Sequence, residues 1–116
     1  MIVEYSFDYD MMEAEVFLKV DTEKFKPEDA KVLLEFFTWE YDKEADPVEE
    51  LLKKYALQVI KIASLENFNE YGVKTWFEEN EGFPALDGSV GIELFYVSQY
   101  TFAEERLFFT KQTIKR

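Results

Sequence analysis

The chain of 116 residues contains no cysteine and no histidine. Without cysteine there is no disulfide framework, no thiolate metal site and no cysteine nucleophile. Without histidine the chain lacks the commonest zinc ligand, the usual general base near neutral pH and the histidine-dependent nucleophile triads. No S-x-x-K motif supplies a lysine base for the serines. We therefore expect no catalytic residues of these kinds, no metal site and no cofactor.

Basic residues are also scarce. The chain has 13 lysines and arginines and 25 aspartates and glutamates, which gives a net charge of -12. Such a chain repels phosphate backbones and anionic lipid surfaces. No apolar run approaches the length of a membrane span, and the first ten residues carry no signal-peptide pattern. We expect no direct nucleic-acid binding, no membrane association and a cytoplasmic location.

Apolar side chains, in contrast, are abundant. The hydrophobic fraction is 47% and the aromatic fraction is 18%, which excludes a disordered acidic tail. A chain of this length buries one core without metal or disulfide staples. We expect a single domain over residues 1–116.

Two stretches near the amino terminus alternate between apolar and polar residues, as half-buried strands do. They cover residues 2–8 and the region around residues 16–20. The short polar break between them predicts an antiparallel hairpin. The side chains expected to share one face are Val3, Tyr5 and Phe7, then Val16, Leu18 and Val20.

Two helices are predicted next. Pro27 suits the first turn of a helix that we end near Trp39. In the segment DPVEE, Asp46 is expected to cap a central helix, with Glu49 reaching back as in a capping box, and this helix ends before Asn67. Helical spacing predicts a buried stripe of Val48, Leu51, Leu52, Tyr55, Ala56, Val59, Ile60 and Ala63; Leu57 and Ile62 fall off it, which indicates burial on more than one side.

The last third of the chain is less regular. Residues 73–80 are interpreted as a short helix, although alternation of Val73, Thr75 and Phe77 would also suit a strand. The runs SVGIELFYVSQY and RLFFTKQTIK predict a second hairpin. The order β-β-α-α-(α)-β-β indicates an α+β domain: a two-layer sandwich in which two to three helices cover one face of a four-stranded antiparallel sheet.

The stretch EGFPALDGSVGI, from Glu81 to Ile92, has the appearance of a motif. A phosphate-binding loop would need a preceding strand, a following helix and usually a lysine, and this stretch has none of them. We interpret it as a structural loop that stops a helix and begins a strand, built on Gly82, Pro84, Asp87, Gly88 and Gly91.

The same stretch carries a family resemblance. Together with the FDYD opening and the DTEKFKPEDA entry to the first helix, GFPALDGSVGI resembles a bacterial family of small acidic proteins catalogued as a domain of unknown function, 2528. The hairpin of residues 101–116 has no counterpart in that resemblance. The resemblance implies a related fold and no established activity.

Two carboxylate clusters could offer oxygen ligands to calcium or magnesium: Asp8, Asp10 and Glu13, and Asp42, Glu44 and Asp46. Neither has the EF-hand pattern, so solvated turns are the simpler interpretation. An alternative function is a metal-assisted or carboxylate-based enzyme that uses the Asp87 loop. Another alternative is a small-ligand binder with an aromatic pocket between helices and sheet.

The surplus of aromatic residues suggests a surface function. If Ile92, Leu94 and Tyr96 face the helices, the side chains expected on the outer face of the sheet are Phe17, Phe95, Val97 and Phe108, with Phe109 as the alternative to Phe108. Exposed rings of this kind mark a surface for a protein partner or a homodimer. The leading hypothesis is a non-enzymatic binding module, with an inhibitor of a basic partner as a special case; the competing interpretation is that the carboxyl-terminal segment or a curled sheet covers the rings.

Overall fold

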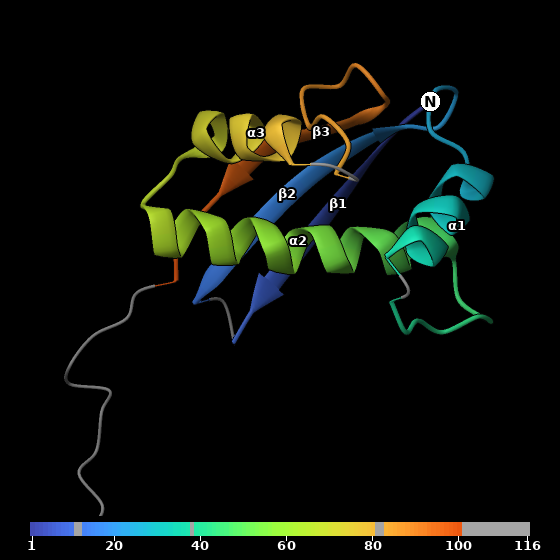
Figure 1. Cartoon of the computed structure of the whole chain (residues 1–116), viewed down its shortest axis with the longest axis horizontal. Helices are drawn as coiled ribbons and strands as arrows, with labels where there is room; N and C mark the ends of the chain where they lie inside the picture. Colours follow the sequence, from blue (N-terminus) through green and yellow to red (C-terminus); the bar gives the residue numbers. More distant parts are fainter. Residues whose placement is uncertain (11–12, 38, 81–82, 101–116) are drawn as a thin grey trace, which may run out of the picture.

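The computed structural model describes residues 1–10, 13–37, 39–80 and 83–100. Within these residues the chain forms an α+β fold with three helices and one antiparallel sheet of three strands (Figure 1). The predicted fourth strand falls in residues 101–116, outside the described residues. The elements in chain order are β1 (Ile2–Tyr9), β2 (Ala14–Asp21), α1 (Pro27–Phe36), α2 (Pro47–Glu66), α3 (Glu70–Glu79) and β3 (Ile92–Val97).

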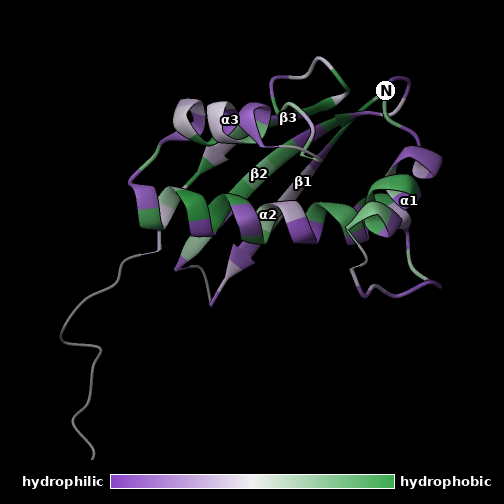
Figure 2. Ribbon diagram, in the orientation of Figure 1, coloured by the Kyte–Doolittle hydropathy of each residue, from purple (hydrophilic) through white to green (hydrophobic). Residues whose placement is uncertain are grey.

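The sheet has the order β1-β2-β3, with β2 in the centre. The predicted amino-terminal hairpin is confirmed, since β1 and β2 pair in antiparallel fashion with Val3 opposite Val20 and Phe7 opposite Val16. Alternate residues of β2 are buried from Ala14 onward, whereas the intervening residues are half-buried. Figure 2 shows apolar residues along β2 where α2 crosses it. One face of the sheet therefore lies in the core.

A β-bulge interrupts the pairing of β2 with β3. Leu18 lies opposite Leu94, but the next residue of β2, Phe17, lies opposite Tyr96, so Phe95 is an extra residue in β3. An inserted residue reverses the face of every side chain beyond it. The predicted alternation of β3 is wrong for this reason: Tyr96 is 41% exposed and Val97 is only 8% exposed, the opposite of what we expected.

Helix α1 begins at Pro27 as predicted. The backbone N–H of Lys26 donates a hydrogen bond of 2.8 Å to the carboxylate of Asp29, which closes the first turn. The helix ends at Phe36, earlier than the predicted end near Trp39. The Trp39 N–H bonds to the carbonyl of Leu34, five residues back, so the chain leaves the α-helical pattern there.

Helix α2 agrees closely with the prediction. Asp46 caps it by accepting a 2.9 Å hydrogen bond from the Val48 N–H, and Asn67 terminates it in a left-handed conformation, with φ of 56°. All eight residues of the predicted stripe are buried, and so is Ile62. Leu57 is 40% exposed, so our inference that it is buried is wrong.

Helix α3 confirms the helical interpretation of residues 73–80. Asn69 caps it by accepting a hydrogen bond of 3.1 Å from the Gly72 N–H, and Val73 and Phe77 are fully buried. Helices α2 and α3 pack on the buried face of the sheet, while α1 packs beside α2 near its amino end (Figure 1). The opposite face of the sheet carries no helix among the described residues.

Candidate interaction surface

The open face of the sheet carries three neighbouring aromatic rings, Phe17, Phe95 and Tyr96, which we call the outer patch. The ring centroid of Phe17 lies 5.7 Å from that of Phe95 and 5.0 Å from that of Tyr96. Phe95 is 37% exposed and Tyr96 is 41% exposed, and Phe17 between them is half-buried. The bulge creates this patch, because it directs two consecutive residues of β3 away from the core.

Charged side chains surround the outer patch. The ammonium group of Lys19 lies 4.6 Å from the centroid of the Phe95 ring, a cation–π contact. Lys19 is paired in the sheet with Glu4 of β1 on one side and Glu93 of β3 on the other. Asp8 and Glu15 pair farther along the same face. The patch therefore has an apolar centre and a mainly acidic rim.

The four residues predicted for the interface do not have the same outcome. It brings Phe17 and Phe95 together, whereas Val97 is buried in the core, and Phe108 lies outside the described residues. Tyr96 was assigned to the wrong face. The sequence of β3 gave no signal for this, because strict alternation divides the adjacent rings of Phe95 and Tyr96 between two faces and only the bulge places both on the same face.

The loop of residues 83–92 forms a tight turn before β3. Gly88 and Gly91 both have positive φ, 92° and 100°, where glycine is strongly preferred. The Asp87 carboxylate accepts a 2.9 Å hydrogen bond from the Ser89 N–H, and the bonds from Ser89 hold the pKa of Asp87 below its ordinary value. An ionised carboxylate of this kind cannot serve as a general acid near neutral pH. Gly82 lies outside the described residues, and Pro84 is half-buried.

Gly91 also connects this loop to the end of β2. Its carbonyl accepts a 2.8 Å hydrogen bond from the Asp21 N–H. A Cβ atom at Gly91 would lie 2.9 Å from the Cβ of Lys24 and 3.0 Å from the backbone nitrogen of Phe25. These contacts give the glycine a role in bringing two backbone segments close together.

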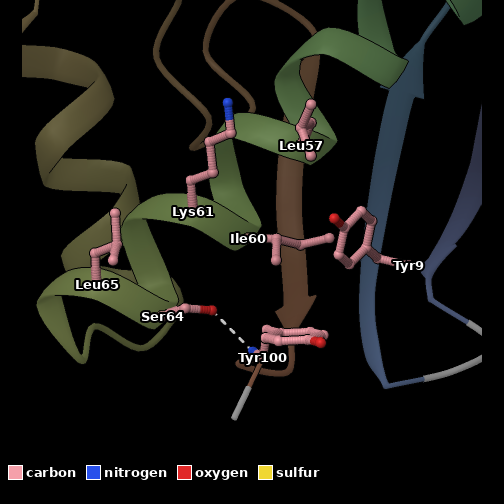
Figure 3. A pocket seen from close by; sticks show the side chains of 7 residues that line it. All are labelled: Tyr9, Leu57, Ile60, Lys61, Ser64, Leu65 and Tyr100. Carbon is pink, nitrogen blue, oxygen red and sulfur yellow. Dashed lines mark hydrogen bonds between the residues drawn. The ribbon is translucent and has the colours of Figure 1, made fainter. Parts of the chain in front are cut away.

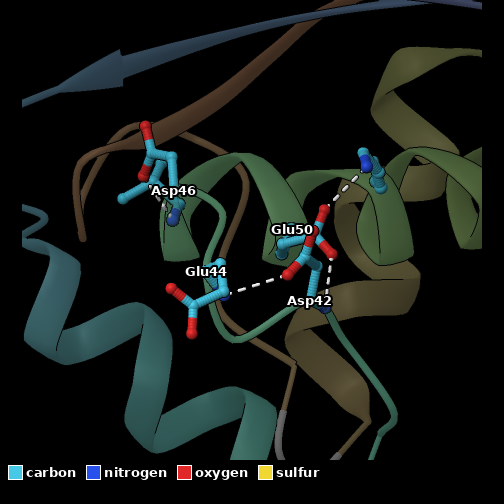
Figure 4. Close-up of polar contacts among 6 residues, drawn as sticks. Asp42, Glu44, Asp46 and Glu50 are labelled. Carbon is cyan, nitrogen blue, oxygen red and sulfur yellow. Dashed lines mark hydrogen bonds and ion pairs between the residues drawn. The ribbon is translucent and has the colours of Figure 1, made fainter.

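The acidic segment before α2 uses its carboxylates to bind backbone groups (Figure 4). Asp42 accepts a 2.9 Å bond from the Glu44 N–H, and Asp46 caps α2. The side chain that reaches back is Glu50, not the predicted Glu49: Glu50 accepts a 2.9 Å bond from the Asp42 N–H. No group of three acidic, histidine or cysteine residues in the described part of the chain is arranged to hold a metal ion.

Glu50 is a structural residue that the sequence did not single out. It is 7% exposed, and its second oxygen lies 2.6 Å from the ammonium group of Lys53. The bond from Lys53, followed by the bond from the Asp42 backbone, lowers the pKa of Glu50. A charged group at a buried position needs such partners.

A hollow of about 310 Å³ lies beside the carboxyl end of α2 (Figure 3). The ring of Tyr100 forms one wall of this hollow. The backbone N–H of Tyr100 donates a 2.8 Å hydrogen bond to the Ser64 hydroxyl. This volume is at the lower limit for small-molecule sites. The lining residues are Tyr9, Leu57, Ile60, Lys61, Ser64, Leu65 and Tyr100.

These features define an α+β protein with an aromatic patch on the open face of its sheet. Residues 15–105 match the model of a family described as protein of unknown function (DUF2528), and the chain belongs to that family. The family match includes the loop of residues 81–92 that suggested the resemblance. No curated protein and no solved structure matches the chain. Among the described residues, none of the helices combines the length and the apolar character needed to cross a membrane.

Proposed function

We propose that this protein is a non-enzymatic binding module that holds a protein partner on its outer patch. The observation that carries the proposal is the β-bulge at Phe95, which places Phe95 and Tyr96 together beside Phe17 on the face opposite the helices. Alternation without a bulge would have buried one of these two rings. Clustered exposed aromatic side chains are the usual energetic centre of a protein interface.

The acidic rim indicates what the partner looks like. Glu4 and Glu93 flank Lys19, and Asp8 pairs with Glu15 on the same face. With a net charge of -12, the whole molecule attracts basic surfaces and steers them to the patch before contact. The partner we propose is a cytoplasmic protein with an apolar centre and a basic rim. A nucleic-acid-binding protein would fit, in which case the module acts as an inhibitor.

Self-association through the same rings is the second candidate. A second copy would cover the exposed surface of Phe95 and Tyr96 with identical rings. It would also bring two acidic rims together, so this dimer should be favoured by salt, which screens the repulsion. Binding to a basic partner should instead be weakened by salt, so ionic strength separates the two candidates.

The test compares the unsubstituted chain with Phe95→Glu as baits in a native cell extract. We expect proteins of basic composition that the unsubstituted chain retains at low salt, that Phe95→Glu does not retain, and that salt elutes. Leu65→Glu is the matched control, because Leu65 is 73% exposed on α2, away from the patch. Equal retention by the unsubstituted chain and Phe95→Glu would refute the proposed surface.

Sedimentation of the purified chain at low and high salt completes the design. A dimer that forms more strongly at high salt and is lost in Phe95→Glu supports self-association. A monomer at both salt concentrations leaves the basic partner as the proposed ligand. Thermal melting of each variant checks that the fold is retained, which we expect because Phe95 is 37% exposed and Lys19 is close enough to pair with the new carboxylate.

A further inference from the structure

The sheet of described strands has two outer edges, and the edge of β3 is covered. The Leu94 N–H donates to the carbonyl of Leu86 at 2.9 Å. Farther along the strand, the Val97 N–H donates to the carboxylate of Glu70 at 2.8 Å. These bonds occupy backbone groups that a further strand would need. The edge of β3 is therefore not available to a partner.

The other edge belongs to β1, which pairs only with β2 among the described residues. One bond at the start of the strand fixes the direction of its backbone groups: the Thr22 N–H donates to the carbonyl of Met1 at 2.9 Å, one pair beyond Ile2 and Asp21. Bonded and non-bonded pairs alternate along an antiparallel ladder. The residues whose N–H and C=O groups point away from β2 are therefore Ile2, Glu4, Ser6 and Asp8. Such an edge can accept a strand from another chain.

A groove lies between β1 and α2 on the inner side of this edge. It includes a hollow of about 110 Å³, which shares Tyr9, Leu57 and Ile60 with the hollow of about 310 Å³ in Figure 3. The residues that line the smaller hollow are Phe7, Asp8, Tyr9, Lys53, Ala56, Leu57 and Ile60. Together the two hollows form one mainly apolar depression, which we call the β1 groove.

Apolar side chains on this side of the sheet are incompletely covered. Tyr5 and Phe7 of β1 are half-buried, whereas their partners on β2, Leu18 and Val16, are fully buried. Leu57 of α2, which lines both hollows, is 40% exposed. A strand added to β1 would direct every second side chain to this side and cover these residues.

The side chains on the other face of β1 define the charge of the partner. Glu4 and Asp8 are exposed there, with Ser6 between them. Basic side chains opposite these carboxylates would form favourable cross-strand pairs, whereas acidic side chains would be repelled. A second copy of this chain would bring its own Glu4 and Asp8 and a net charge of -12. Charge therefore favours a basic partner over a second copy.

We propose that β1 binds an extended segment of a partner protein by strand addition, and that apolar and basic side chains alternate in this segment. Its backbone pairs with the outward N–H and C=O groups of β1. Its apolar side chains lie in the β1 groove against Leu57, and its basic side chains lie beside Glu4 and Asp8. Main-chain bonds supply the affinity in this mode of binding, and alternate side chains supply the specificity. This site goes beyond the proposed function because it uses the backbone edge of the sheet and not the rings of the outer patch.

Amide hydrogen exchange of the full chain, followed by nuclear magnetic resonance, shows first whether the edge is free. Relative to their intrinsic rates, the amides of Glu4, Ser6 and Asp8 should exchange at least about tenfold faster than those of Tyr5 and Phe7, which bond to β2. Equal protection of both groups in the isolated chain overturns the proposal. If that protection rises with protein concentration, a second copy holds the edge; if it does not, the chain itself holds it.

The ligand used as a probe is a short capped peptide in which valine and lysine alternate. At saturation it should slow exchange at Glu4, Ser6 and Asp8 at least about tenfold. A peptide of the same composition with its valines and lysines in separate blocks is the matched control for charge alone. An alternating peptide of valine and glutamate is the control for the sign of the charge. Neither control should protect these amides, and equal protection by either of them overturns the proposal.

Two changes test the backbone pairing itself. N-methylation of every second residue of the probe should abolish protection for one alternate set of residues and not for the other, because only one set directs its amides at β1. Ser6→Pro removes an outward N–H, a change that an edge strand tolerates, and should weaken binding of the probe about tenfold. Ser6→Val, which keeps this N–H, should bind the probe about tenfold more tightly than Ser6→Pro.

Thermal melting checks that Ser6→Pro is folded, and the two methylated probes give the answer without any substitution in the protein. Equal loss of protection with both methylated probes contradicts strand addition. Equal affinity of folded Ser6→Pro and Ser6→Val for the probe contradicts it as well, because the outward N–H of residue 6 would then make no bond to the ligand.

Discussion

The ring of Phe17 on β2 lies 5.0 Å from the ring of Tyr96 on β3, on the face of the sheet that carries no helix among the described residues. Tyr96 reaches that face because Phe95 is bulged out of the ladder. The same bulge returns Val97 to the core, opposite Val16. One inserted residue therefore sets the composition of both faces of the sheet at this end.

The bulge leads to a prediction about two neighbouring residues. Val97→Glu should lower the free energy of unfolding by about 3 kcal/mol or more, because it buries a carboxylate in an apolar site. Tyr96→Glu should cost about 1 kcal/mol or less, since its side chain is partly in solvent. Urea unfolding of both variants measures the difference. Equal costs, or a larger cost for Tyr96→Glu, would mean that β3 alternates regularly.

The two loop glycines should respond differently to alanine. Gly91→Ala combines positive φ with a Cβ only 2.9 Å from Lys24, whereas at Gly88 the nearest atom to a new Cβ is 3.9 Å away. We expect Gly88→Ala to cost about 1 kcal/mol, from the backbone conformation alone, and Gly91→Ala to cost at least twice that amount. Thermal melting of the two variants gives the comparison. A smaller loss for Gly91→Ala would contradict the close approach of the loop to residues 24 and 25.

Glu50 should contribute a pH-dependent part of the stability. Its pKa is lowered in the folded state, mainly by Lys53, so its contribution is complete above the pKa of an unfolded glutamate, about 4.3. The contribution is lost as the pH falls through the lower folded pKa. Glu50→Gln should therefore have a lower melting temperature than the unsubstituted chain at pH 7, and this difference in melting temperature should narrow below about pH 4. Glu49→Gln, at an exposed position in the same turn, is the control. A difference in melting temperature between Glu50→Gln and the unsubstituted chain that stays constant with pH would show that the charge of Glu50 does not stabilise the fold.

Tyr55 offers a prediction of the opposite sign. Its side chain is fully buried among the rings of Trp39, Phe77 and Phe83, and its hydroxyl has no hydrogen-bond partner among the described residues. Removing an unsatisfied buried hydroxyl removes a cost of about 1–3 kcal/mol. Tyr55→Phe should therefore be as stable as the unsubstituted chain or up to about 2 kcal/mol more stable.

The pH dependence of the same variant provides a second readout. Burial raises the pKa of Tyr55 in the folded state. Below the unfolded pKa near 10 the hydroxyl is protonated in both states and the stability does not depend on pH through this group. Above it only the unfolded chain ionises, so the free energy of unfolding falls as the pH rises toward the folded pKa. The unsubstituted chain should lose stability above about pH 10 more steeply than Tyr55→Phe. A parallel loss of stability in both proteins would show that the pKa of Tyr55 is not raised in the folded state. A variant that is destabilised at pH 7 would show that the hydroxyl has a hydrogen-bond partner.

The sequence by itself determined most of the local structure. The hairpin of β1 and β2 follows from period-two alternation, and α2 follows from the Asp46 cap and a helical stripe of apolar residues. The family relationship was also visible in the loop of residues 81–92, and the family match covers residues 15–105. These signals are local, because each depends on residues a few positions apart.

Tertiary structure decided the features that concern the candidate surface. The bulge at Phe95 depends on how β3 fits against β2, a strand more than seventy residues away in the chain, and periodicity within β3 gives no sign of it. The selection of Glu50 over Glu49 depends on where the incoming loop brings the Asp42 N–H. The edge of β3 is occupied because α3 places Glu70 beside Val97 and the loop places Leu86 beside Leu94. Local propensity predicts the elements, but which face a side chain shows and which backbone groups are free depend on register and packing between distant segments.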